Sequence, residues 1–122
     1  MLNAMSSRLR RRKAAQRWVQ ASVFAALGDQ RRLLLVTKLC GGEPQSIAHL
    51  TEGSKLTRQA ITKHLRVLES VGVVRSVRRG RESLFEFKRG PIEKARKYLD
   101  LVSAEWDQTL GRLKSFVEDS YS

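Results

Sequence analysis

TRQAITKHLRVLESVG, residues 57 to 72, has the pattern of an amphipathic helix with a defined start and end. Apolar residues recur at the helical repeat on one face: Ile61, Leu65, Leu68 and Val71. Thr57 suits the N-cap, and Gly72 suits the position where the chain leaves a helix. The opposite face carries Arg58, Gln59, Thr62, Lys63 and Arg66. These side chains suit phosphates and base edges, so the stretch predicts a helix that lies along a nucleic-acid groove. An ordinary basic surface helix fits the stretch equally well. The flanking segments decide between these two interpretations.

A short helix and a tight turn are predicted directly before this stretch. Ser46 to Glu52, SIAHLTE, predicts the short helix, with Ile47 and Leu50 as its apolar anchors. The connection Gly53-Ser54-Lys55-Leu56 has the right length for a helix-turn-helix, whose second helix is then residues 57–72.

After Gly72 the pattern changes from helical to alternating. Val73 to Arg78 and Glu82 to Lys88 predict two strands of a β-hairpin, with Phe85 and Phe87 on its core face. Arginines cluster around the glycine turn: Arg75, Arg78, Arg79 and Arg81. Four arginines favour a cationic wing that follows a phosphate backbone or enters a narrow minor groove. An edge hairpin kept soluble by charge would mix lysine with glutamate instead.

The segments before residue 46 predict two further helices and a basic arm. The first helix runs from Ala14 to near Gly28, and Asp29 caps a second, QRRLLLVTKLC, which Gly41-Gly42 ends. Cys40, the single cysteine, is predicted to be a small core residue. Residues 1–13 are predicted to be a disordered basic arm, whose candidate DNA contacts are Arg10, Arg11 and Arg12.

The last segment predicts one long helix, from Pro91 to Asp119. Spacings of three and four residues define a heptad seam: Ile92, Ala95, Leu99, Val102, Trp106, Thr109, Leu113 and Phe116. The helix would be roughly 40 Å long, which is more than so small a core covers. We therefore expect the same helix of a second subunit to pack on it, with the first helix of the same chain as the alternative. The predicted dimer interface consists of Trp18, Leu99, Val102, Trp106, Leu113 and Phe116.

The 122 residues carry 24 Lys/Arg against 12 Asp/Glu, a net charge of +12. Such an excess is more often kept for a polyanion than for stability, because self-repulsion disfavours compaction. It lies in residues 1–90, which hold 19 Lys/Arg and 6 Asp/Glu, whereas residues 91–122 hold 5 and 6. The length fits one domain. With one cysteine, no membrane-length apolar run and no signal-peptide h-region, we expect a soluble cytoplasmic protein that does not bind membranes.

The order of helix, helix, helix-turn-helix, hairpin and long helix resembles the winged helix-turn-helix of the ArsR/SmtB family of bacterial transcription repressors. Three stretches carry the resemblance: VFAALGDQRR at residues 23–32, QAITKHLRVLESVGVV at residues 59–74, and VRRGRESLFEF at residues 77–87. The resemblance implies a mainly α fold with a small β-hairpin. Residues 14–90 are then the DNA-binding domain, and residues 91–119 are its C-terminal dimerisation helix. It also implies a homodimer joined by the first and last helices and bound to double-stranded DNA of the nucleoid, at an inverted-repeat operator in its own promoter region.

The chain departs from the metal-sensing members of that family. Ser46-Ile47-Ala48 takes the place of their Cys-x-Cys pair, and the last helix offers Asp100 and Glu105 but no histidine. A zinc site takes about four N, S or O ligands, so we expect no metal and no cofactor. His64 is predicted to be a partly buried helix residue. The chain resembles the metal-free branch, whose inducing signals vary, and the sequence names no small-molecule effector.

Within the groove helix, Gln59 and Thr62 are the predicted base readers, because glutamine bonds adenine bidentately and threonine meets a base or the thymine methyl group. The predicted phosphate contacts are Lys55, Arg58, Lys63 and Arg66. Two other classes of function remain open. The net charge also fits an RNA-binding or ribosome-associated module, and the long last helix also fits an adaptor for a partner protein. An enzyme is not expected, since no nucleophile lies beside a base and no glycine-rich phosphate loop precedes a helix.

Overall fold

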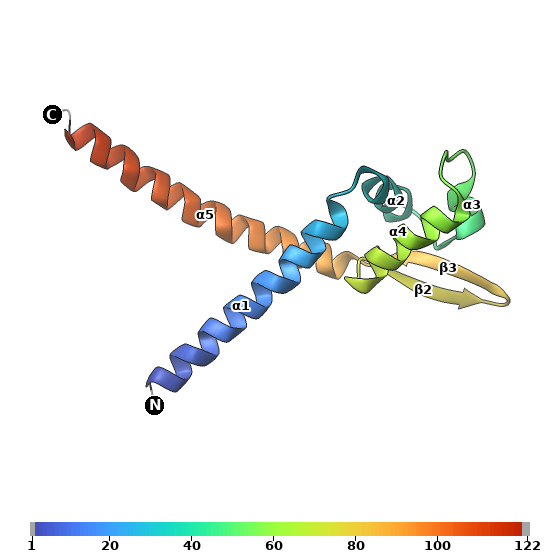
Figure 1. The fold of residues 1–122 in the computed structure, drawn as a ribbon, viewed down its shortest axis with the longest axis horizontal. Coiled ribbons are helices and arrows are strands. Elements are labelled where there is room, and N and C mark those ends of the chain that lie inside the picture. Colours follow the sequence, from blue (N-terminus) through green and yellow to red (C-terminus); the bar gives the residue numbers. More distant parts are fainter. Residues whose placement is uncertain (1, 121–122) are drawn as a thin grey trace.

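Two long helices, α1 (Leu2–Leu27) and α5 (Arg89–Ser120), cross each other beside a smaller group of helices and strands (Figure 1). The computed structural model describes residues 2–120, and it describes side chains from residue 6 to residue 120. The smaller group consists of α2 (Gln30–Cys40), β1 (Gln45–Ser46), α3 (Ile47–Thr51), α4 (Arg58–Ser70), β2 (Val74–Arg79) and β3 (Glu82–Phe87). The predicted fold class, mainly α with a small β-hairpin, is confirmed.

The sheet has three antiparallel strands in the order β1-β3-β2. The predicted hairpin is β2 and β3, paired from Val74 opposite Phe87 to Arg79 opposite Glu82. Only Gly80 and Arg81 lie between the paired ends, and Gly80 has a φ of 62°. A positive φ at the first of two turn residues is the type II′ geometry, which favours glycine. The third strand, β1, is not predicted by the sequence, because two residues are too short to display an alternating pattern.

Side-chain caps fix where three of the helices begin. Asp29 accepts hydrogen bonds from the backbone N–H of Arg31 at 2.8 Å and of Arg32 at 3.2 Å, as predicted for the start of α2. Ser46 Oγ accepts from His49 N at 3.1 Å, and Thr57 Oγ1 accepts from Ala60 N at 3.1 Å. The predicted boundaries of α3 and α4 therefore hold to within two residues.

The core lies where the apolar face of α4 meets α2, α3 and the sheet. Leu65 and Leu68 are fully buried, as is Phe85 of β3. The other buried apolar residues of this cluster are Val23, Ala26, Leu35, Val36, Leu39, Leu50, Ile61, Val73, Val74 and Ala95. Phe87 packs against the cluster from its edge. Both phenylalanines thus face the core, as their alternation in the sequence predicts.

The N-terminus differs from the prediction. Residues 1–13 were expected to be a disordered arm, but α1 begins at Leu2, and Arg10 Nε donates a hydrogen bond to the Ser6 carbonyl at 3.4 Å. No glycine or proline interrupts residues 2–27, and each residue added to an existing helix gains one backbone hydrogen bond. Repulsion between neighbouring cations costs only about 0.2 to 0.5 kcal/mol per pair, so charge alone does not end the helix. Met1 lies outside the described residues.

Cys40 is exposed, so its predicted place in the core was wrong. The buried stripe of α2 is Leu35, Val36 and Leu39. Cys40 follows Leu39 directly, and consecutive residues of an α-helix point about 100° apart. The stripe therefore leaves Cys40 on the solvent side.

The helices α1 and α5 pack on each other only in part. Val23 and Ala26 of α1 and Ala95 of α5 are buried, whereas every residue of α5 from Ser103 to Ser120 is exposed. The intramolecular contact expected as an alternative is present, but it leaves the distal half of α5 uncovered. The apolar residues exposed there are Trp106, Leu110, Leu113, Phe116 and Val117.

Truncating Leu65 should destabilise the protein far more than truncating Val67 on the same helix. Leu65 is 0% exposed, and Leu65→Ala leaves a cavity that we expect to cost about 2 to 5 kcal/mol. Val67 is 39% exposed, and Val67→Ala should cost roughly 0.5 kcal/mol. Urea unfolding at one protein concentration measures both, and equal losses would contradict the core described for α4.

Candidate nucleic-acid interface

The solvent side of α4 carries the residues that the sequence assigns to DNA. Arg58, Gln59 and Lys63 are exposed, and Thr62 is half-buried at the edge of this face. Thr62 Oγ1 donates a hydrogen bond to the Arg58 carbonyl at 2.7 Å. The hydroxyl proton of Thr62 is therefore engaged within the helix, which leaves its oxygen as an acceptor and its methyl group for contact with a partner.

The turn between α3 and α4 presents Lys55 to solvent. Gly53 adopts a φ of 70°, which glycine permits, and Ser54 Oγ accepts a hydrogen bond from Leu56 N at 3.0 Å. Leu56 packs against the core cluster. The backbone of the turn is thus fixed on both sides of Lys55, which is exposed and precedes the N-cap Thr57 of α4 by two residues.

Arg66 differs from the other predicted phosphate contacts because it has partners within the protein. Its Nη1 lies 2.7 Å from Glu69 Oε1, and its guanidinium carbon lies 5.8 Å from the centre of the Phe85 ring. Ser76 Oγ of β2 donates to the other oxygen of Glu69. The Ser76 hydroxyl, followed by Arg66, holds the pKa of Glu69 below its ordinary value. This cluster ties the C-terminal half of α4 to the sheet.

The arginines of the hairpin fall into two groups. Arg75 forms an ion pair with Glu86 on the neighbouring strand, with Nε 2.8 Å from Oε1. Arg78, Arg79 and Arg81 are exposed around Gly80, and none has a carboxylate partner in the part of the chain that the structure describes. The tip of the hairpin therefore holds three cations available to an external anion.

Arg32 joins α1 to α4, a contact that the sequence does not predict. Its Nε donates to the Ala26 carbonyl at 2.5 Å, and its Nη1 donates to Nδ1 of the half-buried His64 at 3.3 Å. The last carbonyls of a helix lack intrahelical partners, so an arginine shortly after the end of α1 was the available signal. His64 is partly buried, as predicted, and serves as the acceptor on α4.

The predicted dimer residues lie on the uncovered surfaces of α1 and α5. Trp18 is 74% exposed and Phe116 is 70% exposed. Leu99, Trp106 and Leu113 are also exposed, and Val102 is half-buried. Large apolar side chains on a projecting helix are the kind of surface that another chain covers.

The described residues lack two kinds of feature, a metal-ligand cluster and a membrane-spanning helix. Residues 6–120 contain no group of three or more His, Cys, Asp or Glu side chains placed to hold a metal ion. Of the helices described, none combines the length and the apolar character needed to cross a membrane. Ser46, where the resemblance expects a cysteine in the metal-sensing members, caps α3.

Comparison with known proteins identifies the family. The chain is 37% identical to an ArsR-like transcriptional regulator from Rhodococcus sp. RHA1, and the match covers 84% of this chain and 95% of that one, with a TM-score of 0.75. The chain belongs to the ArsR-like family of transcriptional regulators. This ArsR-like regulator is also 36% identical over 78 residues to an uncharacterized HTH-type transcriptional regulator, YuzN of Bacillus subtilis, covering 59% of this chain and 85% of that protein. No protein-family profile matches the chain.

A further solved structure similar to this ArsR-like regulator is a homodimeric winged helix-turn-helix DNA-binding domain from Mycobacterium bovis, a possible ArsR-family regulator. It is 26% identical, covers 81% of this chain and 88% of that one, and has a TM-score of 0.60. The resemblance drawn from the sequence is confirmed, and so is the winged helix-turn-helix fold.

The Glu69 cluster predicts a pH dependence of stability. The pKa of Glu69 is lowered in the folded state. The stability that ionised Glu69 adds to the fold is therefore fully present above its unfolded-state pKa, and it is lost as the pH falls through its folded-state pKa. Glu69→Gln should destabilise the protein at about pH 7, by up to about 1 kcal/mol, and by much less at about pH 3. Unfolding at both pH values tests this, with Glu118→Gln on α5 as the matched surface control. A Glu69→Gln deficit that is unchanged at the lower pH would contradict the assignment.

Proposed function

We propose that this ArsR-like regulator is a cytoplasmic homodimeric repressor that binds an inverted-repeat operator in double-stranded DNA, including one in its own promoter region. The observation that carries the proposal is the solvent side of α4, where Gln59 and Thr62 lie among cations. The hairpin that follows α4 adds tip arginines that have no carboxylate partner among the described residues. Figure 1 supports this arrangement, because α4 and the hairpin lie at the end of the molecule away from the free ends of α1 and α5.

The residues of α4 divide into two roles. Gln59 and Thr62 read base edges in the major groove, glutamine by paired hydrogen bonds and threonine through its oxygen or its methyl group. Arg58 and Lys63, with Lys55 from the turn, hold phosphates and set the register of the helix. Arg66 joins them by exchanging its contact with Glu69 for a phosphate.

The wing and the N-terminal helix add contacts outside the major groove. Arg78, Arg79 and Arg81 approach the flanking minor groove or its phosphates, while Arg75 stays in its pair with Glu86. Arg10, Arg11 and Arg12 are exposed on α1. Consecutive helical residues diverge by about 100°, so only part of this run meets any one phosphate strand.

The dimer is formed by the uncovered apolar surfaces of α1 and α5. Trp106, Leu113 and Phe116 continue the seam beyond the point where α1 stops covering α5. A two-fold axis along this seam brings the same face of both copies together and places two α4 helices in successive major grooves. The homodimeric Mycobacterium bovis domain supports this assembly.

The RNA-binding alternative needs exposed aromatic side chains on which unpaired bases stack. The hairpin offers none, since Phe85 is fully buried and Phe87 packs against the core. Competition between duplex DNA and single-stranded RNA of equal length separates the two functions, and a preference for the RNA would overturn the repressor proposal.

Substitutions on α4 should separate base reading from phosphate binding. Gln59→Ala should cost roughly 1 to 3 kcal/mol, and only at the base pair that Gln59 contacts. Lys63→Ala should weaken all DNA sequences alike and reduce the slope of log affinity against log salt by about one. Titration of operator and random duplexes at several salt concentrations gives both quantities. If Gln59→Ala weakened operator and random DNA equally, its assignment as a base reader would be wrong.

A charge in the seam should separate the subunits. Leu113→Glu buries a carboxylate in the proposed interface and should shift sedimentation equilibrium towards the monomer and lower operator affinity together. Ser115→Glu adds the same charge on the same helix outside the seam and should leave the dimer intact. A wild-type protein that sediments as a monomer at every concentration would favour the adaptor alternative over the repressor.

A further inference from the structure

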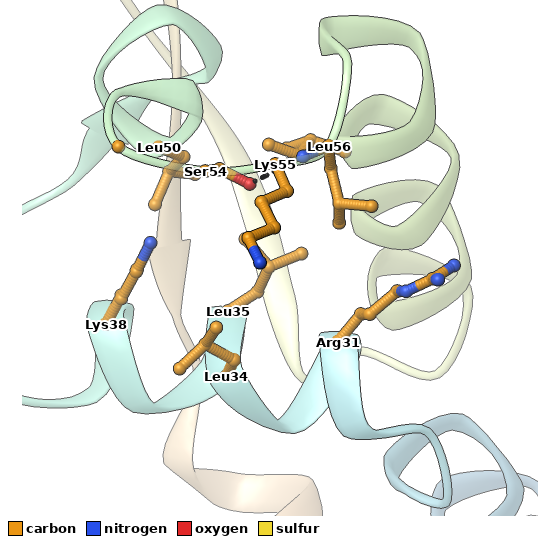
Figure 2. Close-up of a pocket in the computed structure, with 10 residues that line it drawn as sticks. Arg31, Leu34, Leu35, Lys38, Leu50, Ser54, Lys55 and Leu56 are labelled. Carbon is orange, nitrogen blue, oxygen red and sulfur yellow. Dashed lines mark hydrogen bonds between the residues drawn. The ribbon is translucent and has the colours of Figure 1, made fainter.

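A pocket of 370 Å³ lies between α2, the turn after α3, and the start of α4, and we call it the turn pocket (Figure 2). Its floor consists of Leu35, Leu50 and Ile61, which belong to the core. Leu34 and Leu56 form its apolar walls. Leu34 is 57% exposed although it stands next to this apolar floor. The volume is within the range of about 300 to 1,000 Å³ that small-molecule sites occupy.

Three cations surround this apolar pocket. Arg31 and Lys38 rise from α2 on either side of it, and Lys55 reaches down from the turn between them (Figure 2). No acidic residue lines the pocket. Within the described residues, none of the three side chains has a carboxylate partner, although five other ion pairs form elsewhere in the same structure.

This arrangement favours a particular chemistry of ligand. Like charges that face one another beside apolar walls repel, and a bound anion relieves that repulsion. A purely ionic ligand such as phosphate would leave the leucine walls exposed to water. A carboxylate with an apolar tail satisfies both parts, because its tail covers Leu34 and Leu35 while its head meets the cations.

We propose that the turn pocket binds a small amphipathic monocarboxylate and that this ligand lowers the affinity of the protein for DNA. The second half rests on the repressor function proposed above. Lys55 lines the pocket and is also a proposed phosphate contact, so a carboxylate bound to Lys55 competes with DNA for the same cation. The ligand also contacts Leu56 and Ile61, which belong to the turn and to α4. By linkage, bound DNA lowers the affinity of the protein for the ligand by the same factor by which the ligand lowers its affinity for DNA.

Octanoate is the probe for the pocket, and the first titration contains no DNA. We expect octanoate to bind saturably, one per chain, and to shift the NMR amide signals of α2, the turn and the start of α4. Octanamide keeps the tail and lacks the charge, and propionate keeps the charge and lacks most of the tail. Both should bind more weakly than octanoate.

Two variants test whether the cations and the apolar wall contribute. Lys38→Gln removes a cation that has no proposed role on DNA and should weaken octanoate about 2- to 5-fold, the range for an exposed ionic contact. Leu34→Asn removes apolar wall at an exposed position and should also weaken it. Lys114→Gln makes the same change on α5, at a residue that does not line the pocket. It is the matched control and should bind octanoate as the wild type does. Octanamide binding as tightly as octanoate, no effect of Lys38→Gln, or signal shifts confined to α5 would each overturn the pocket.

The effect on DNA is measured separately, with an operator fragment recovered by genomic selection. Saturating octanoate should lower operator affinity of the wild type, and Lys38→Gln should require a correspondingly higher octanoate concentration for the same loss. Octanoate that binds without changing operator affinity would overturn the regulatory half of the proposal and leave the repressor function standing. A protein that binds no DNA even without octanoate would overturn the repressor function, while the DNA-free titration still decides the pocket.

Discussion

Leu65 and Leu68 attach one face of α4 to the core, and this attachment determines which residues of α4 reach solvent. Both leucines are fully buried, and Phe85 of the central strand is buried beside them. A helix rotates as a unit, so fixing these side chains also fixes the direction of Gln59 and Lys63 on the opposite face. The same burial packs the base of the hairpin against α4, while its arginine tip projects from the body of the protein (Figure 1). The surface proposed to face DNA therefore depends on the packing beneath it.

Polar contacts at the middle and in the C-terminal half of α4 add to this packing. Arg66, Glu69 and Ser76 join the C-terminal half of α4 to β2, and Arg32 joins His64 to the last carbonyls of α1. The contact between Arg32 and the last carbonyls of α1 matters for assembly, because α1 and α5 carry the apolar surface proposed for the dimer. Arg32 thus links α1, which belongs to the proposed dimer surface, to α4, the proposed reading helix. Charge-assisted hydrogen bonds of this kind position a side chain more strictly than apolar contact alone.

The sequence predicted the elements whose signals are local and strong. The leucine spacing and the Thr57 cap predicted α4, the Asp29 cap predicted α2, and the alternating pattern after Gly72 predicted the hairpin. The short β1 was missed because a two-residue strand exists only through its pairing with Leu84 and Phe85. The helical N-terminus is not predicted because a run of cations is also typical of disordered tails, although arginine and lysine are good helix formers. The prediction for Cys40 was wrong because cysteine is a residue type that is often buried, whereas its position directly after Leu39 on α2 leaves it exposed.

Contacts between distant segments were beyond the sequence. Arg32 and His64 are 32 residues apart, and the turn pocket is formed by residues of α2, the turn and α4 that only the fold brings together. The solvent face of α4, by contrast, is predictable from the sequence. Arg58, Gln59 and Lys63 were placed correctly on it, because helical spacing alone determines which residues share a face. Periodicity thus predicts surfaces within one element, whereas pockets and interhelical hydrogen bonds require the tertiary structure.

Selection of bound fragments from the source genome tests the central claim, that α4 reads DNA as one of a symmetric pair. The account predicts fragments that share an inverted repeat with half-sites about 10 base pairs apart, centre to centre, including one close to the coding sequence of this protein. Recovery of fragments without a shared inverted repeat would contradict it.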